Sequence, residues 1–339
     1  MKIYQQSGYA DIGGILAEGF PFNFIVGARG VGKTYGALND SVEKDETFLF
    51  MRRTQNQCDL ISKPDFSPFV PLNEKINGWN VKVKPVSRYN SMFYTEEGEK
   101  VKIHGYTCAL STISNMRGFS ASQVTRLLYD EFIPEPHERP IKKEGEALFN
   151  AYETVNRNRE LEGLPALQLC AMANSNDIAN PVFEELKLIR IADKMKKSGA
   201  SRWTDDKRGI QLIMMSNSPI SQRKRDTALY RLTAGTDFSN MAINNDFNVD
   251  RMHVKARPIN EFIPVCSIGE LYIYRHKAEM RLYGTTFKNG VFAKNFSTSD
   301  TEKMRYRRLY MHHFDMYIEN KIDFEDVLAE KLFLKYWDM

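Results

Sequence analysis

The feature that most constrains this fold is a glycine-rich loop directly after a short apolar run near the amino terminus. Residues 22–26 are apolar enough to form a buried strand, and residues 35–42 can begin a helix. Between them stands Gly-Ala-Arg-Gly-Val-Gly-Lys-Thr, which fits the pattern GxxxxGK[ST]. In such a loop the backbone N–H groups and the amino end of the helix face phosphate groups. We therefore predict a nucleotide-binding loop made of Gly27, Ala28, Arg29, Gly30, Val31, Gly32, Lys33 and Thr34.

Two side chains of this loop have separate expected functions. Lys33 would contact the β- and γ-phosphates, and the hydroxyl group of Thr34 would bind Mg²⁺. ATP and Mg²⁺ are therefore the expected nucleotide and metal, and we do not expect a guanine-specific switch.

A second motif supplies the acidic groups that such a site needs. Residues 125–129 have the composition of a buried strand and are followed by Asp130 and Glu131. A carboxylate at the end of a buried strand is where P-loop enzymes bind Mg²⁺, which is the function expected of Asp130. Glu131 could then orient and deprotonate the attacking water. The alternative is an ordinary acidic pair on a surface turn.

A third strand candidate, residues 166–173, ends in the sequence Asn-Ser-Asn. Asn174 at its end could sense the γ-phosphate and transmit the state of the nucleotide to the rest of the protein. The alternative is a plain turn before a helix that begins near Pro181, a residue suited to the first turn. The residues alone favour neither interpretation.

Strand candidates and helical stretches alternate along the first two thirds of the chain, which predicts an α/β fold with a mostly parallel sheet between helices. Residues 79–105 should form an antiparallel hairpin on the edge of that sheet. We expect a long helix at 142–161, a further strand at 211–216 and a basic helix at 221–233. The predicted organisation is a P-loop ATPase domain at 1–199, a basic linker at 200–245 and a C-terminal domain at 246–339.

The composition excludes several classes of protein. No apolar run approaches the roughly 18 residues that span a bilayer, and the first residues lack the layout of a signal peptide. The four cysteines are far apart, with no CxxC pair, which favours reduced thiols in a cytoplasm. The net charge is only +4, but residues 251–311 contain twelve Lys and Arg against five Asp and Glu. Such a cluster is either a solvated surface or a track for a polyphosphate.

Together these motifs resemble the ATPases of viral DNA-packaging motors, the large-terminase class, and most of all the packaging ATPase of the small protein-primed podophages. Residues 27–34, including Arg29, look like the P-loop of that family, and residues 128–132 are similar to its acidic strand end. Residues 154–160 match the segment with its trans-acting arginine, which falls on Arg157. Asn174 matches its sensor strand. The resemblance runs from about residue 20 to residue 250.

The resemblance implies an ATP hydrolase that moves double-stranded DNA into a procapsid. It implies a homomeric ring, expected to be a pentamer, with catalysis at subunit interfaces. The ring would dock on the portal of the procapsid in the host cytoplasm, and a structural packaging RNA is a further candidate partner. Arg117 stands where close relatives have a trans-acting lysine, whereas Arg29 works in cis in the broader class. The sequence does not show which of Arg29, Arg117, Arg157 and Arg159 acts in trans.

For residues 246–339 the resemblance implies a small α+β, RNase-H-like domain, following an ATPase domain of the ASCE type. A terminase nuclease needs clustered carboxylates for two metals. The acids at 261, 270, 279, 300 and 302 are instead scattered among cations, so we expect a vestigial nuclease that binds nucleic acid or the rest of the motor. Two other functions stay open for the whole chain. One is a different P-loop motor, such as a helicase or a conjugative or filament-extrusion ATPase, and the other is a nucleotide-gated scaffold that binds nucleic acid.

Overall fold

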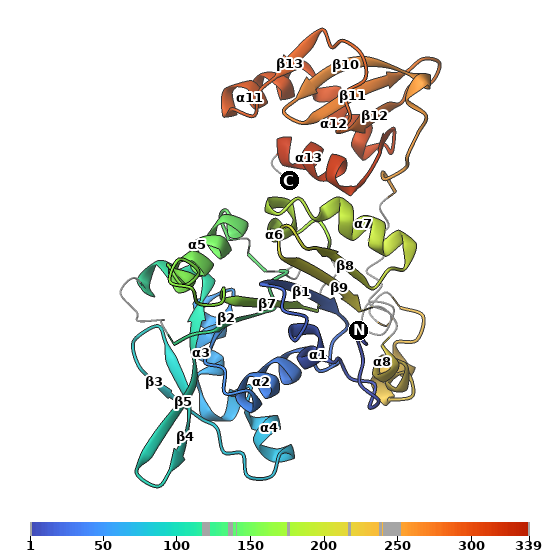
Figure 1. Ribbon diagram of the computed structural model, residues 1–339. Helices are drawn as coiled ribbons and strands as arrows, with labels where there is room; N and C mark the ends of the chain where they lie inside the picture. Colours follow the sequence, from blue (N-terminus) through green and yellow to red (C-terminus); the bar gives the residue numbers. More distant parts are fainter. Residues whose placement is uncertain are drawn as a thin grey trace. The chain divides into compact units, whose positions relative to one another are not determined.

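A computed structural model describes residues 2–116, 123–134, 138–139, 141–174, 177–215, 218–236, 239 and 252–337. The chain forms two compact units (Figure 1). The first consists of Met1–Leu186 and Met195–Phe247, and the second of Lys187–Lys194 and Asn248–Met339. Helix α7 (Ile189–Ser198) is divided between them.

The first unit is built on a nine-stranded sheet in the order β3-β4-β5-β2-β6-β7-β1-β9-β8. Six adjacent strands, from β5 to β9 in this order, are mutually parallel, which confirms the predicted sheet. Strand β4 pairs antiparallel with β5, and β3 pairs antiparallel with β4, as the edge hairpin predicted for 79–105. Strand β8 pairs antiparallel with β9 at the other edge. The strands are β1 (Phe22–Gly27), β2 (Phe48–Arg52), β3 (Lys82–Pro85), β4 (Ser91–Glu97), β5 (Lys100–Ala109), β6 (Arg126–Asp130), β7 (Gln168–Ala173), β8 (Arg202–Asp205) and β9 (Ile210–Met215).

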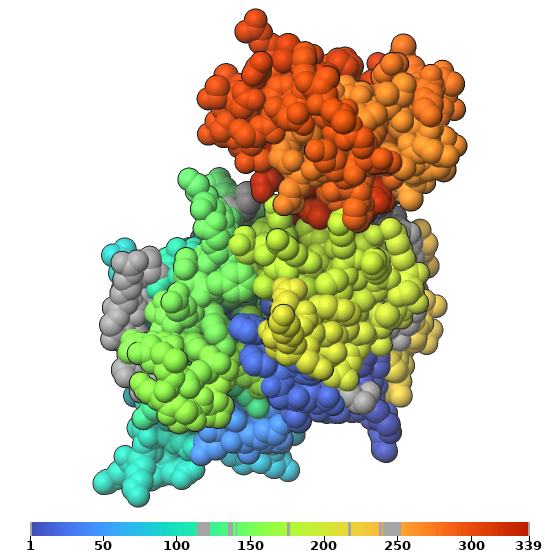
Figure 2. Space-filling view, turned by 45° about the horizontal axis from the view of Figure 1, so that its top comes forward, coloured from blue at the N-terminus to red at the C-terminus, as the bar shows by residue number. Residues whose placement is uncertain are grey.

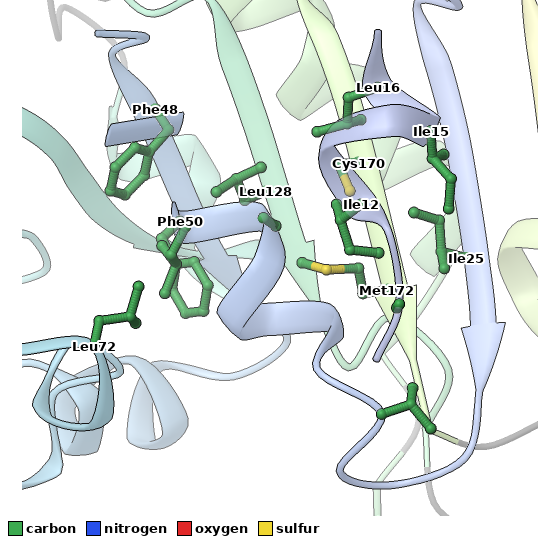
Figure 3. Close-up of a cluster of buried hydrophobic side chains, with 14 of the residues drawn as sticks. Ile12, Ile15, Leu16, Ile25, Phe48, Phe50, Leu72, Leu128, Cys170 and Met172 are labelled. Atoms are coloured by element: carbon green, nitrogen blue, oxygen red, sulfur yellow. The ribbon is translucent and has the colours of Figure 1, made fainter. Parts of the chain in front are cut away.

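Helices cover both faces of this sheet because the side chains of its central strands are buried on both sides. Helices α1 (Ile12–Leu16), α2 (Lys33–Glu43) and α4 (Val70–Lys75) lie on one face (Figure 1). On that face the apolar side chains of α1 lie opposite those of β1 and β7 (Figure 3). Helices α5 (Glu144–Asn156) and α6 (Pro181–Glu185) lie on the other face, where aromatic side chains of the strands and of α6 pack together. The remaining elements are α3 (Gln55–Ile61), η1 (Pro64–Phe66), η2 (Leu110–Met116), α8 (Pro219–Lys224) and α9 (Ala228–Leu232).

Strand register aligns the ends of four strands at one edge of the sheet. Val26 of β1 pairs with Ala173 of β7, and Asp130 of β6 pairs with Met172 of the same strand. Strand β2 pairs in parallel with β6 on its other side. Since the carboxyl ends of parallel strands meet at one edge, the residues that follow these strands converge there.

Three predicted boundaries were wrong. The helix predicted at 142–161 ends at Asn156, and the basic helix predicted at 221–233 is two short helices, α8 and α9. The chain turns after Asn156 because its side chain accepts a hydrogen bond from the Leu167 backbone (2.8 Å). The linker predicted at 200–245 includes β8 and β9, which pair into the sheet and belong to the first unit.

The second unit contains a five-stranded sheet in the order β13-β10-β11-β12-β14. Strands β10, β11 and β12 form an antiparallel meander, whereas β13 and β14 pair in parallel with its two edges. Three helices follow β13, and β14 lies between the second and the third of them. The elements are η3 (Ile259–Glu261), β10 (Phe262–Ile268), β11 (Leu271–His276), β12 (Leu282–Thr285), β13 (Lys294–Phe296), α11 (Asp300–Leu309), α12 (Met311–Ile318), β14 (Ile322–Phe324) and α13 (Val327–Tyr336).

The core of the second unit is apolar and aromatic and lies between its sheet and helices. Tyr274 and Tyr283 are buried in a smaller cluster, so neither is placed to stack on a nucleic-acid base. All four cysteines of the chain are buried free thiols. Among the residues that the structure describes, no helix is long and apolar enough to cross a membrane.

Candidate nucleotide-binding and catalytic site

The loop predicted to bind phosphate lies at the carboxyl edge of the sheet, between β1 and the first turn of α2. Gly30 and Gly32 both have positive φ angles, 70° and 89°, which other residues rarely adopt. Gly32 is the residue directly before helix α2. The glycines of the motif therefore permit the turn that directs the loop into the helix.

Lys33 is buried beneath this loop, with 5% of its surface exposed. Its Nζ donates hydrogen bonds to the carbonyls of Gly27 (2.8 Å) and Ala28 (2.9 Å) and to Oδ1 of Asn174 (3.0 Å). Burial lowers the pKa of Lys33 to about 7, although the charge of nearby Asp130 raises it. The predicted sensor Asn174 thus contacts the predicted phosphate-binding lysine directly.

Thr34 and Asp130 meet as the sequence predicts for a magnesium site. The hydroxyl of Thr34 donates to Oδ1 of Asp130 at 3.1 Å, and Asp130 is 8% exposed. A hydroxyl and a carboxylate oxygen are ligands that Mg²⁺ accepts, and both lie beside the phosphate loop. The residues present therefore fit this metal.

Arg52, which sequence reasoning missed, contacts both acidic residues of the motif. Its Nη1 lies 2.7 Å from Oδ2 of Asp130, and its Nη2 lies 2.9 Å from Oε2 of Glu131. The backbone of Glu131 has a φ of 57°, a left-handed conformation that is uncommon outside glycine. Arg52 is the last residue of β2, which pairs with β6, and it belongs to no motif that would have identified it from the sequence.

Lys224 of α8 is a second cation that the sequence did not assign to this site. Its Nζ donates to the carbonyl oxygen of Arg29 at 2.5 Å. A Cβ atom added at Gly30 would lie 2.4 Å from the same Nζ, so the ammonium lies directly against the loop. Burial lowers the pKa of Lys224, and the charges of Lys224 and Arg29 both lower the pKa of Lys33. Cations on three side chains thus surround a loop suited to an anion.

Arg157 lies at the opposite edge of the sheet from Lys33. Helix α5 begins after β6 and runs back to the start of β7, where Asn156 contacts the Leu167 backbone. Arg157 is exposed, has φ 47° and donates from Nε to the Thr154 carbonyl at 3.3 Å. The green segment that follows α5 protrudes at the surface in Figure 2. Arg157 therefore lies near the start of β7, whereas Asn174 and Lys33 meet at its end.

Of the other candidate arginines, the structure describes Arg159 but not Arg117. Arg159 donates from Nη1 to the Val124 carbonyl and from Nε to the Pro165 carbonyl, both at 3.2 Å, so it joins the turn to the amino edge of the sheet. Arg117 lies outside the described residues.

Residues 320–323 read Asn-Lys-Ile-Asp, the pattern by which guanine-specific switches recognise their base. This pattern lies on and before β14 in the second unit. Its acid, Asp323, has a side chain only 2% exposed that pairs with Arg257 (2.8 Å) and Arg281 (3.2 Å). Its carboxylate is therefore occupied within the fold and is not presented to a base.

Across the described part of the chain, no three His, Cys, Asp or Glu side chains are grouped so that they could bind a metal ion. Two described carboxylates of the second unit, Asp323 and Asp326, instead pair with arginines.

Comparison with known proteins gives a family match and several relatives. Residues 5–268 match the model of the podovirus DNA encapsidation protein (Gp16) family. The chain is 27% identical over 231 residues to the DNA packaging proteins of Bacillus phages PZA and phi29, which covers 66% of this chain and 61% of each relative. It is 26% identical over 273 residues to that of Bacillus phage B103, covering 78% of this chain and 77% of the relative. The match thus spans about three fifths of the length of the first two relatives.

Two solved structures have a similar fold. The bacteriophage Phi-29 viral genome packaging motor assembly contains a chain with a TM-score of 0.69 and 20% identity, covering 99% of this chain and 100% of that one. The Phi-28 gp11 DNA packaging motor gives 0.59 and 20%, with 95% of both chains covered. The fold of this chain is therefore that of the packaging-motor chains.

Proposed function

Because the chain belongs to the podovirus DNA encapsidation protein family, we propose that it is the ATP-hydrolysing motor that moves double-stranded viral DNA into a procapsid. The observation that carries this proposal is the convergence of Lys33, Thr34, Asp130, Glu131 and Asn174 at one edge of the sheet. Strand β7 lies between β1 and β6, so the sensor residue stands between the phosphate loop and the acids. This order supports an ATPase of the ASCE type.

Each side chain of the site has a defined task in hydrolysis. The backbone of residues 27–34 and the ammonium of Lys33 bind the phosphates, with Arg29 and Lys224 adding positive charge at the loop. Thr34 and Asp130 would bind Mg²⁺, which supplies charge neutralisation on the phosphate oxygens when bound. Glu131 orients the attacking water and accepts its proton. Asn174 contacts Lys33 and transmits the presence of the γ-phosphate to β7.

Arg52 adds a requirement to this scheme. Its guanidinium pairs with Asp130 and Glu131 at the same time, so the metal ligand and the base share one positive charge. A carboxylate paired with a guanidinium is a weaker base than a free one. Glu131 therefore becomes active when the guanidinium of Arg52 is drawn away from it.

The subunits act as a homomeric ring, expected to be a pentamer, with Arg157 serving the site of a neighbour. Support comes from the exposed position of Arg157 at the edge of the sheet remote from its own Lys33. A guanidinium suits this task because its fork pairs with phosphate oxygens and does not lose its charge. The portal, DNA and a structural packaging RNA are the proposed partners, in the host cytoplasm at the procapsid.

The second unit is proposed to be an RNase-H-like domain without nuclease activity that binds nucleic acid or other parts of the motor. A two-metal nuclease requires carboxylates that converge, whereas the buried Asp323 is engaged by two arginines. The cations at 251–311 supply the positive charge for a polyphosphate partner.

The proposal is tested by steady-state ATPase activity with and without duplex DNA, measured against protein concentration. We expect stimulation by DNA and a specific activity that rises with concentration, because sites completed by a neighbour need assembled subunits. Hydrolysis that is independent of both would contradict the composite-ring mechanism. Nucleotide binding without turnover would support the scaffold, and unwinding of a forked duplex would support a helicase.

A further inference from the structure

Several backbone carbonyl groups of the phosphate loop are held by hydrogen-bond donors. The Nζ of Lys33 donates to the carbonyls of Gly27 and Ala28. The N–H of Ala10, in the segment before β1, donates to the carbonyl of Val31 at 2.8 Å. These bonds fix the side of the loop on which its carbonyl oxygens lie.

The carbonyl of Arg29 is held by a residue from a distant part of the chain. It accepts a hydrogen bond of 2.5 Å from the Nζ of Lys224, which is 195 residues away in sequence. Because a trans peptide group is planar, its C=O and N–H point in opposite directions. The carbonyl of Arg29 is held toward Lys224, so the N–H of Gly30 points away from that ammonium.

The orientation of this peptide matters for an anion. A loop binds phosphate when successive N–H groups converge on it, whereas a rotated peptide presents a carbonyl oxygen to the anion instead. Gly30 has a φ of 70° and no side chain, so the backbone is free to rotate at this position. A Cβ atom at Gly30 would also take the space of the Lys224 ammonium. The glycine thus leaves room for the group that restricts its own peptide.

Helix α8 is fixed beside the loop by its first residues. Strand β9 pairs Met215 with Gly27, so the chain leaves the sheet next to the start of the loop. Ile220 of α8 then packs on the apolar core. A Cβ atom added at Gly8 would lie 3.1 Å from Cβ of Pro219, so α8 also lies against the amino-terminal segment. The last residue of α8, Lys224, is therefore held where it contacts the loop.

We propose that Lys224 is a positioning residue of the nucleotide site: its hydrogen bond to the carbonyl of Arg29 holds the Gly30 N–H in the orientation that binds phosphate. This inference rests on the proposed function of the loop and adds the helix that follows β9 to the site. Displacement of α8 then weakens phosphate binding, so this helix regulates release of the nucleotide.

Calorimetry with Mg²⁺ tests the proposal by measuring the Kd of ATP and of inorganic tripolyphosphate. Lys224→Met has a side chain of similar length without a donor. It should raise both Kd values by about tenfold to a hundredfold, since both ligands have the phosphates. Lys224→Arg retains a charged donor and should recover most of the affinity. Arg223→Ala, exposed on the same helix, is the matched control and should bind both ligands like the wild type.

Gly30→Ala separates positioning from simple attraction between charges. Its methyl group displaces the ammonium from the carbonyl of Arg29, so adding Lys224→Met to this variant should change either Kd by less than about twofold. An equal loss in the wild-type and Gly30→Ala backgrounds would mean that Lys224 acts through its charge alone, which overturns the positioning role.

Hydrogen–deuterium exchange of residues 28–32 without nucleotide is a second measurement. Lys224→Met should speed exchange there, because the peptide is released before any phosphate is present. Unchanged exchange, or unchanged Kd values in Lys224→Met while Lys33→Ala loses binding, would overturn the inference and leave the proposed function intact. Failure of the proposed function gives a different result: wild-type protein would bind neither ligand, or Lys33→Ala would bind both as the wild type does.

Discussion

At the residue scale, the guanidinium of Arg52 contacts both acidic side chains on which the proposed hydrolysis depends. Its single positive charge is shared between these two carboxylates. On the phosphate side of the site, the ammonium of Lys33 is buried. Its described hydrogen-bond partners are all oxygen atoms of the protein. The site is thus poised for a polyphosphate with its metal ion.

The separate tasks of Lys33 and Glu131 predict different defects. Lys33→Ala removes the cation on the phosphates and should abolish tight ATP binding. Glu131→Gln preserves size and hydrogen bonding but removes the base, so it should bind ATP and lower turnover by about 10²–10⁴. Filter binding with single-turnover hydrolysis separates the two. Equal loss of binding in both variants would show that Glu131 is structural.

Burial of Lys33 predicts a proton linked to nucleotide binding. Its pKa of about 7 means that at pH 8 most of these side chains are neutral before nucleotide binds. An anionic triphosphate favours the ammonium and raises that pKa, so binding at pH 8 should take up close to one proton, or about 0.9. Affinity should be constant below pH 7 and fall by up to about tenfold per unit above it.

Calorimetry in buffers of different ionisation enthalpy measures this proton directly. Glu131→Gln is the control, because it retains Lys33. The charge of Glu131 raises the pKa of Lys33, so the variant should take up at least as much proton at pH 8 as the wild type. Wild-type binding at pH 8 without proton uptake would show that Lys33 is already charged in the nucleotide-free protein.

The sequence predicted the site residues that belong to continuous motifs. Lys33 and Thr34 follow glycines in the loop, Asp130 and Glu131 follow a strand, and the fold brings them together because parallel strands end at one edge. Arg52 and Lys224 belong to no motif. Their contacts arise from strand order and from where α8 packs, which no local pattern encodes.

At the element scale, α5 is joined to the catalytic edge by Arg53, the neighbour of Arg52. Arg53 is fully buried, and its Nε donates to Glu144 Oε1 at 2.6 Å in the first turn of α5. Glu144 also accepts from Nη2 of Arg53 (3.0 Å) and from the hydroxyl of Tyr129 (3.3 Å). Adjacent arginines thus connect the acidic pair and the helix that leads to Arg157.

This buried pair predicts a large loss of stability. Arg53→Ala would leave the carboxylate of Glu144 buried without its charged partner, at a cost of about 3–5 kcal/mol in the free energy of unfolding. Urea unfolding measures the change, with exposed Arg88→Ala as the control, expected within about 0.5 kcal/mol of the wild type. A loss below about 1 kcal/mol for Arg53→Ala would mean that Glu144 gains water or another partner.

The sequence could predict that α5 exists but not where it ends. Its helical pattern continues past Asn156, yet the side chain of Asn156 bonds the chain that returns to β7, and Arg157 takes a positive φ. Likewise, a linker is predicted where β8 and β9 lie, because the neighbouring residues in the sequence are polar and basic. Pairing with β1 buries β9, and that partner is nearly two hundred residues away in sequence.

At the scale of the whole molecule, the position of Arg157 predicts complementation between subunits. Arg157→Ala should bind ATP normally but hydrolyse it poorly, since a trans arginine contributes roughly 10³–10⁵ to turnover in other P-loop enzymes. Mixing it with Glu131→Gln, also inactive alone, should restore activity because an intact Arg157 then faces an intact Glu131.

DNA-stimulated ATPase activity of the two variants, alone and mixed at several ratios, measures this effect. Glu162→Ala, on the same exposed turn, is the control and should keep wild-type turnover. Full activity of Arg157→Ala alone, or mixtures that regain nothing, would assign the trans function to another residue, with Arg117 and Arg159 the next candidates.

The central claim is ATP-powered movement along intact duplex DNA, and displacement of a labelled third strand from a DNA triplex tests it most directly. With ATP and Mg²⁺ the wild-type chain should release the third strand while the duplex beneath stays paired. ADP, or Glu131→Gln with ATP, should release none, and a forked duplex should stay closed. Unwinding of the fork, or retention of the third strand while DNA-stimulated hydrolysis proceeds, would contradict the account.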